Sequence, residues 1–146
     1  MPKFDIASLE KSFELLGTRV PKVVSPTVHA IADYVTATSF LVAGAFFWKK
    51  NKRAALASIL CGAAETAVSM LTDYPGGVKN LISFPLHGKI DFGMAGMVAA
   101  MPQFMAFEEA GEKGFFRAQS AMIGALAAAT KFEPQQITGE QERKAA

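Results

Sequence analysis

The chain has 146 residues, enough for one compact domain, and 51% of them are hydrophobic. Its formal net charge of +2 is too small to indicate nucleic-acid binding, and its single cysteine excludes an intrachain disulfide. The charged residues lie mostly outside four apolar stretches, which cover residues 30–48, 54–71, 90–107 and 115–130.

These stretches have the length and composition of membrane-spanning helices. A spanning helix needs roughly 20 mostly apolar residues, which the first three stretches provide and the fourth provides once Gly114 and Phe132 are included. Ala, Gly, Ser and Thr are dense in them, and such small residues let membrane helices pack closely. The sequence therefore predicts an all-α fold, a four-transmembrane-helix bundle. The alternative is an Ala-rich bundle without a membrane.

The two ends of the chain differ from these stretches. Residues 1–24 carry charged side chains and no continuous apolar core, so we expect no cleavable signal peptide. Their apolar side chains recur at helical spacing and predict an N-terminal amphipathic helix on the membrane surface or on a partner subunit, with the apolar face Ile6, Leu9, Phe13 and Leu16. Residues 135–146 predict a flexible polar tail.

The chain also contains an internal repeat. The sequence "VHAIADY", from Val28, is followed 58 residues later by "LHGKIDF", from Leu86. The same shift aligns Ser25 with Ser83, Thr72 with Thr130, and Tyr74 with Phe132. We interpret this agreement as two tandem helical hairpins, in residues 25–75 and 83–134, joined by a linker in residues 76–82. Because each hairpin spans twice, both His-x-x-x-Asp motifs are expected at one membrane face.

This two-hairpin pattern resembles the small bacterial membrane proteins of the SPW-repeat type. The matching residues are "HAIADY", "LTDYPGGVKNLISFPLHGKIDF" and Pro102, and the resemblance covers residues 25–134. The Ser-Pro-Trp tripeptide itself is missing, since its expected places read "AGAFFW" and "AAMPQF". The resemblance implies a membrane location and no established chemistry.

Four polar residues in the repeated motif are the candidate site. Histidine and aspartate four positions apart lie on one face of a helix. If the first and third helices are neighbours, the motif residues converge in one layer: His29, Asp33, His87 and Asp91. They could pair reciprocally as a structural lock, His29 with Asp91 and His87 with Asp33. They could also hold a zinc ion with all four side chains, or a haem between His29 and His87.

A further interpretation is ion or proton movement. Carboxylates inside a membrane are energetically costly, which makes them functional candidates. Glu65 is the one charged residue of the second apolar stretch, and it could join Asp33 and Asp91 in an intramembrane polar cluster. Such a cluster would suit a small ion or proton transporter.

The sequence shows no nucleophile–base set, paired-cysteine motif or phosphate-binding loop, so we expect no enzymatic activity. The predicted function is an accessory or assembly subunit that packs against a larger membrane complex or forms a homo-oligomer. A haem- or metal-binding protein and a transporter are the alternatives. We expect the bacterial inner membrane, with the basic loop between Lys49 and Arg53 on the cytoplasmic side.

Overall fold

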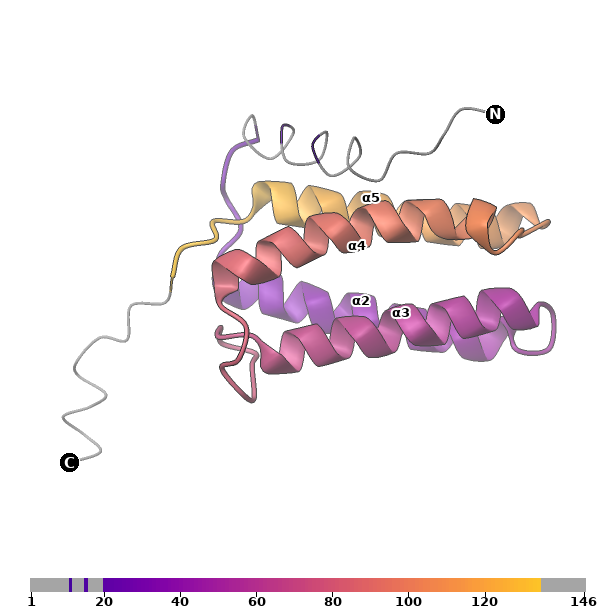
Figure 1. Ribbon diagram of the computed structural model, residues 1–146, viewed down its shortest axis with the longest axis horizontal. Coiled ribbons are helices and arrows are strands. Elements are labelled where there is room, and N and C mark those ends of the chain that lie inside the picture. Colours follow the sequence, from indigo (N-terminus) through magenta and orange to yellow (C-terminus); the bar gives the residue numbers. More distant parts are fainter. Residues whose placement is uncertain (1–10, 12–14, 16–19, 135–146) are drawn as a thin grey trace.

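The computed structural model describes residues 11, 15 and 20–134. In this part of the chain it contains four helices, which Figure 1 shows lying side by side: α2 (Pro26–Phe47), α3 (Lys52–Leu71), α4 (Phe84–Phe104) and α5 (Ala110–Ala129). The described residues form no strands beyond two isolated bridges, so the predicted all-α fold is confirmed. The predicted amphipathic helix before residue 20 and the polar tail fall outside the residues that can be described, apart from two isolated positions.

Short polar side chains determine where three of the helices begin. The Ser25 hydroxyl accepts a hydrogen bond from the Val28 N–H, and Pro26 follows it at the first helical position. Ser83 caps α4 in the same way through the Leu86 N–H. Asn51 caps α3. Such caps contribute about 1 kcal/mol each and satisfy N–H groups that the helix leaves free.

The two helices of the first hairpin, α2 and α3, pack closely through small residues. A side-chain carbon added at Gly44 in α2 would lie 2.7 Å from Ile59 Cγ1 and 3.3 Å from the Ala55 carbonyl oxygen of α3. At Gly62 in α3 it would lie 3.0 Å from the Ala37 carbonyl oxygen of α2. The glycines therefore permit a backbone approach that any larger residue would prevent.

The hairpins stack so that α2 and α4 lie diagonally across the bundle. Each of them packs against α3 and α5, and neither makes an extensive contact with the other. The first and third helices are thus not adjacent along their length, although adjacency was the condition on which the convergence of the motif residues was expected. Each helix is flanked by its hairpin partner, and stacking one hairpin on the other sets α2 beside α5 and α3 beside α4. The side chains of α2 and α4 can still meet on the bundle axis.

The half of the bundle near the loops after Phe47 and Phe104 has an apolar core. Phe40, Phe116 and Val98 are fully buried there, together with several alanines. The Phe40 ring lies 5.5 Å from the Phe115 ring centroid and 5.9 Å from that of Phe116. This end is thus held by aromatic packing, whereas the opposite end is polar.

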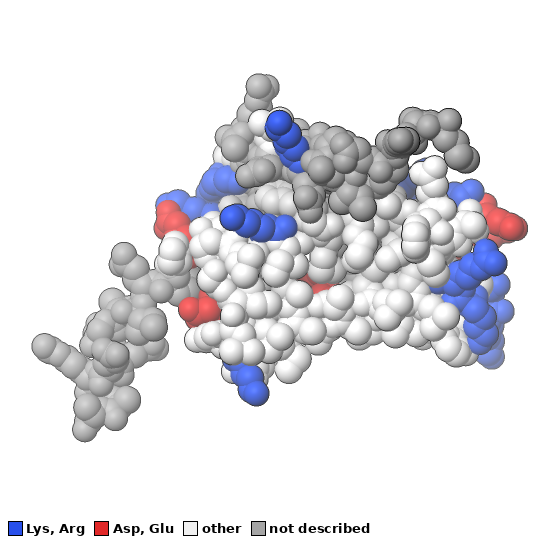
Figure 2. Space-filling model, viewed as in Figure 1, with Lys and Arg blue, Asp and Glu red and all other residues white. Residues whose placement is uncertain are grey.

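Two helices, α2 and α3, are long and apolar enough to cross a membrane. By the same measure α4 and α5 are not, because α4 includes Lys89 and Asp91 and α5 is more charged still. Figure 2 shows most of the charged side chains near the two ends of the molecule, with a mainly uncharged region between them. The structure thus contains two candidate spans of the four that the sequence predicted.

Candidate metal centre

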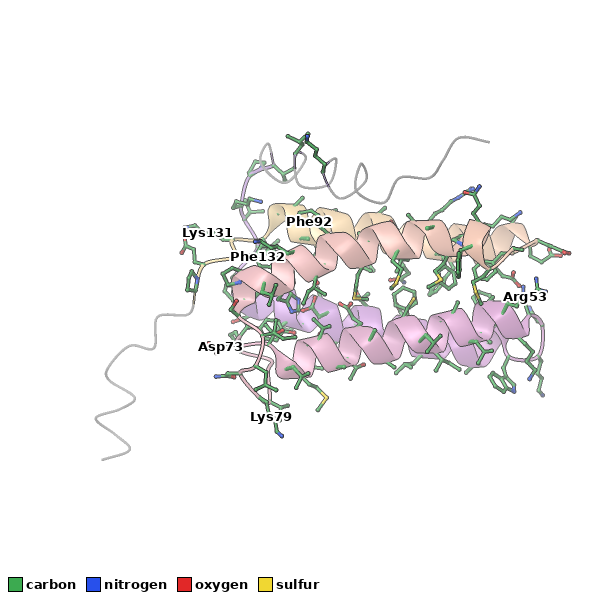
Figure 3. The ribbon with its side chains drawn as sticks, in the orientation of Figure 1. Arg53, Asp73, Lys79, Phe92, Lys131 and Phe132 are labelled. Carbon is green, nitrogen blue, oxygen red and sulfur yellow. The ribbon has the colours of Figure 1, made fainter. Side chains whose placement is uncertain are left out.

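The two His-x-x-x-Asp motifs meet at the end of the bundle where α2 and α4 begin and α3 and α5 end. His29 and Asp33 come from α2, and His87 and Asp91 come from α4. None of the four residues is more than 2% exposed. In Figure 3 this end is the one marked by Asp73 and Phe132, and Arg53 marks the opposite end.

The imidazoles and carboxylates form a closed set of short contacts. His29 Nε2 lies 3.0 Å from Asp91 Oδ2 and 3.3 Å from Asp33 Oδ1. His87 Nε2 lies 3.2 Å from Asp33 Oδ2 and 3.2 Å from Asp91 Oδ1. The two Nε2 atoms are 3.3 Å apart. One ligand atom from each residue lies within 4.8 Å of the other three, so the structure brings together all four predicted metal ligands.

Two threonines fix which ring nitrogen of each histidine carries a proton. The Thr130 hydroxyl donates to the Leu126 carbonyl, and the Thr72 hydroxyl donates to the Val68 carbonyl. A hydroxyl has one proton to donate. With its proton directed to that carbonyl, each threonine oxygen accepts from a histidine protonated on the Nδ1 atom that lies 2.7 Å away: His29 for Thr130 and His87 for Thr72.

The protonated Nδ1 atoms have a direct chemical consequence. A neutral imidazole with a proton on Nδ1 has its free lone pair on Nε2, and both Nε2 atoms face the carboxylates. Metal-binding histidines are commonly held in this way, with the outer N–H bonded to a polar group. Sequence reasoning aligned Thr72 with Thr130 and assigned them no role, although their alignment was the signal that could have found them.

Short backbone contacts hold these threonines in place. The Val24 N–H donates to the Ala129 carbonyl, next to Thr130, and forms an isolated bridge there. Thr72 forms the equivalent bridge with Ile82. Each histidine is thus supported by the end of a helix from the other hairpin, which agrees with the repeat; the duplication itself stays a prediction.

The two carboxylates differ in their surroundings. The Tyr74 hydroxyl donates to Asp33 Oδ2 at 2.9 Å. Burial, reinforced by the nearby Asp33 carboxylate, raises the pKa of Tyr74, so the phenol keeps its proton and remains a donor. The corresponding residue of the second hairpin is Phe132, which has no hydroxyl. Asp91 Oδ1 is buried and makes no hydrogen bond.

Aromatic rings close this end of the site from the solvent. The ring centroids of Phe132 and Phe84 lie 5.2 Å and 5.6 Å from that of His29. Phe132 fits because residue 88 is glycine: an added side-chain carbon there would lie 2.7 Å from its ring. The His29 ring therefore contacts the aromatic rings of Phe84 and Phe132 in addition to the carboxylates at its Nε2 atom.

Glu65 of α3 is the third member of the predicted polar cluster. It is 2% exposed, and its Oε2 atom has no hydrogen-bond partner. It interacts electrostatically with Asp91 and Asp33. It does not belong to the set of four converging ligands.

In comparisons with protein-family models, curated proteins and solved structures, nothing matches this chain. The resemblance to SPW-repeat proteins stays a prediction. What the site can do is therefore argued from its geometry.

Proposed function

We propose that this chain is an integral membrane protein that binds a divalent transition-metal ion, zinc by preference, through His29, Asp33, His87 and Asp91. The observation that supports this most is the orientation of the two histidines. Their Nδ1 protons are engaged by threonines, and their Nε2 atoms converge on two carboxylates. The ion would join the two hairpins at the bundle axis in a non-enzymatic, structural role.

The spacing of the ligand atoms suits a small ion. A tetrahedral zinc site with bonds of about 2.0–2.2 Å has edges of about 3.3–3.6 Å. The contacts around the two Nε2 atoms lie between 3.0 and 3.3 Å, but they involve different oxygens of each aspartate, and a set with one ligand atom per residue extends to 4.8 Å. Binding an ion would draw these four atoms together. Two imidazoles and two carboxylates are also a donor set that zinc accepts.

The charges of the site suit a divalent ion. With neutral histidines protonated on Nδ1, two lone pairs would face one another and the carboxylates with no proton between them; an ion accepts these lone pairs and balances the two carboxylate charges. The rival arrangement is the structural lock, in which both histidines are protonated on Nε2, face each other across 3.3 Å and are balanced by Asp33 and Asp91.

Haem is the less suitable cofactor. A macrocycle held between two histidines would have to pass between their Nε2 atoms. Those atoms are 3.3 Å apart, and oxygens of Asp33 and Asp91 lie beside both. The accessory role was predicted because the sequence shows no recognisable chemical site. The four converging side chains form such a site, so they favour metal binding over a purely accessory role.

We propose that all four helices cross the bilayer. Large apolar side chains are exposed on every helix, as expected for a surface in contact with lipid: Val28, Ile31, Val35, Val42, Phe46, Leu56, Leu60, Met70, Leu86, Met97, Phe104 and Met122. The less apolar α4 and α5 bury Asp91 and Gln119, whereas Lys89 and Arg117 are exposed. The bacterial inner membrane and a cytoplasmic loop at residues 49–53 remain predictions.

Metal analysis of the purified protein tests this proposal. The full chain is extracted gently in detergent, dialysed against metal-free buffer, and measured by mass spectrometry of the elements alongside an absorption spectrum. We expect stoichiometric zinc and no haem absorption band. A chain that contains no metal and takes up none on titration with zinc, cobalt or manganese would overturn the proposal.

Replacing Thr72 with valine tests the support of His87. Valine has nearly the same shape and no oxygen, so the Nδ1–H of His87 loses its acceptor. Changes of such outer partners typically lower metal affinity about 10–100-fold. We expect a loss of that size in a competition titration against a chelator, while Thr72→Ser retains the affinity. Equal affinities for the two variants would contradict the assigned role of the threonine.

A further inference from the structure

A cavity lies at the end of the bundle opposite the His–Asp cluster, the end that Arg53 marks in Figure 3. Its volume is about 800 Å³, and its walls come from the end of α2, the loop into α3, and the loop and first turn of α5. Figure 2 shows basic and acidic side chains gathered at this end. We call this feature the loop cavity, and its charged lining residues are Lys50, Lys52, Arg53, Glu108, Glu109 and Glu112.

The positive and negative side chains of the loop cavity do not pair with one another. The ion pairs in the described part of the chain all lie at the opposite end, within the His–Asp cluster and just after α5. Lys50 Nζ instead lies 4.2 Å from the ring centroid of Phe46, and Lys52 Nζ lies 3.8 Å from that of Trp48. A ligand that carries both signs of charge would therefore find partners for both in one cavity.

Glu112 is a buried carboxylate that lacks a cation. It lines the loop cavity, is 4% exposed, and accepts a hydrogen bond at Oε2 from Asn51 Nδ2 at 2.7 Å. The amide carries no charge, whereas buried carboxylates are normally paired with a cation. The start of α5 offers only about half a unit of positive charge. Glu112 thus supplies a position for a ligand ammonium group.

The basic residues of the same cavity suit a phosphate. The Arg53 guanidinium can bind two phosphate oxygens at once, and Lys50 and Lys52 add two point charges. Phosphatidylethanolamine carries a phosphate and a primary ammonium with three N–H donors. The methylated ammonium of phosphatidylcholine has no N–H donor, and phosphatidylglycerol has no cation. The two signs of charge therefore favour the ethanolamine headgroup.

The surface beside the cavity has room for an acyl chain. Phe46 lines the cavity and is 61% exposed. Val42 and Val35 lie four and eleven residues before it, so the three exposed side chains form one apolar stripe on α2, about 16 Å long. Trp48 is also exposed at this end, and tryptophan favours the headgroup level of a membrane.

We propose that the loop cavity binds the headgroup of one phosphatidylethanolamine molecule. The phosphate lies beside the three basic side chains, the ammonium binds Glu112, and an acyl chain follows the stripe on α2. Headgroup recognition by basic pockets between membrane helices has the same physical basis. This inference rests on the proposed membrane location and is independent of the metal site at the other end.

Lipid selectivity in detergent tests the site. The purified, delipidated full chain is mixed with phosphatidylethanolamine, phosphatidylcholine or phosphatidylglycerol of identical acyl chains, and bound lipid per chain is counted by native mass spectrometry. We expect one bound phosphatidylethanolamine and an affinity about tenfold or more lower for the other two, because neither has a charged N–H donor for Glu112. Equal binding of all three lipids would overturn the site. Equally tight binding of soluble glycerophosphoethanolamine would overturn the lipid as its ligand.

Glu112→Gln tests the ammonium position. Glutamine keeps the shape and an oxygen acceptor for Asn51 but removes the charge, so the preference for phosphatidylethanolamine over phosphatidylcholine should be lost. The matched control is Glu133→Gln, an exposed carboxylate at the opposite end, which should keep the preference. Circular dichroism checks that both variants are folded, and an unchanged preference in a folded Glu112→Gln would overturn the site.

The membrane location is scored separately by cell fractionation of the wild type. A chain in the membrane fraction without lipid selectivity would overturn the lipid site alone. A chain outside the membrane fraction would overturn the proposed location and the lipid site with it.

Discussion

Replacing both His29 and His87 with alanine is expected to abolish metal binding by the purified protein. The two imidazoles supply the nitrogen ligands from α2 and α4, and carboxylates alone hold zinc weakly in competition with water. Because the ion joins the two hairpins, the variant should also lose the stabilisation that zinc gives. Element analysis and thermal unfolding with and without zinc measure both effects.

Tyr74→Phe is the matched control for the double histidine variant. It removes the hydrogen bond to Asp33 and installs the residue that the second hairpin has at Phe132. We expect this variant to retain stoichiometric metal, with an affinity loss of about tenfold or more typical of an outer partner. If the double histidine variant bound as much zinc as Tyr74→Phe, the assignment of the ligands would be wrong.

Phe40→Ala is expected to give the largest loss of stability without loss of the site. Phe40 is fully buried and packs against Phe115 and Phe116 in the apolar half of the bundle. Truncation of a buried phenylalanine typically costs about 3–5 kcal/mol, through lost burial and the cavity left behind. The free energy of unfolding in detergent should fall by that amount while the metal content per folded chain stays the same.

Phe46→Ala is the control for this change. The same side chain is removed from the same helix, but Phe46 is 61% exposed. In detergent its truncation should change the free energy of unfolding by about 0.5 kcal/mol or less. A loss of zinc in Phe40→Ala at full folding would show that the two halves are coupled, which the separate polar and apolar ends do not predict.

These experiments separate two ways in which the bundle is held together. Within the first hairpin, small residues such as Gly44 and Gly62 bring the helices into contact. Between the hairpins, Phe40 packs against Phe115 and Phe116 at one end, and the His–Asp cluster lies on the axis at the other. An ion in this cluster would add a second connection between the hairpins, at the end opposite the aromatic packing.

Much of the architecture could be predicted from local patterns. Ser25 and Ser83, which the repeat aligns, each cap a helix, and capping depends on neighbouring residues alone. The spacing of four between histidine and aspartate placed each pair on one helix face. The number of membrane spans was harder to predict, because average hydropathy is lowered by inward-facing polar residues such as those of α4.

The amino-acid sequence by itself determined four helical stretches and the repeated histidine–aspartate pairs. Only the tertiary structure decided that α2 and α4 lie diagonally and that Thr130 lies beside His29, 101 residues away in the sequence. The physical reason is that helix periodicity is a local property, whereas the neighbours of a buried side chain depend on how whole helices pack. The protonated nitrogen of each histidine is set by such a neighbour, and the metal proposal depends on it.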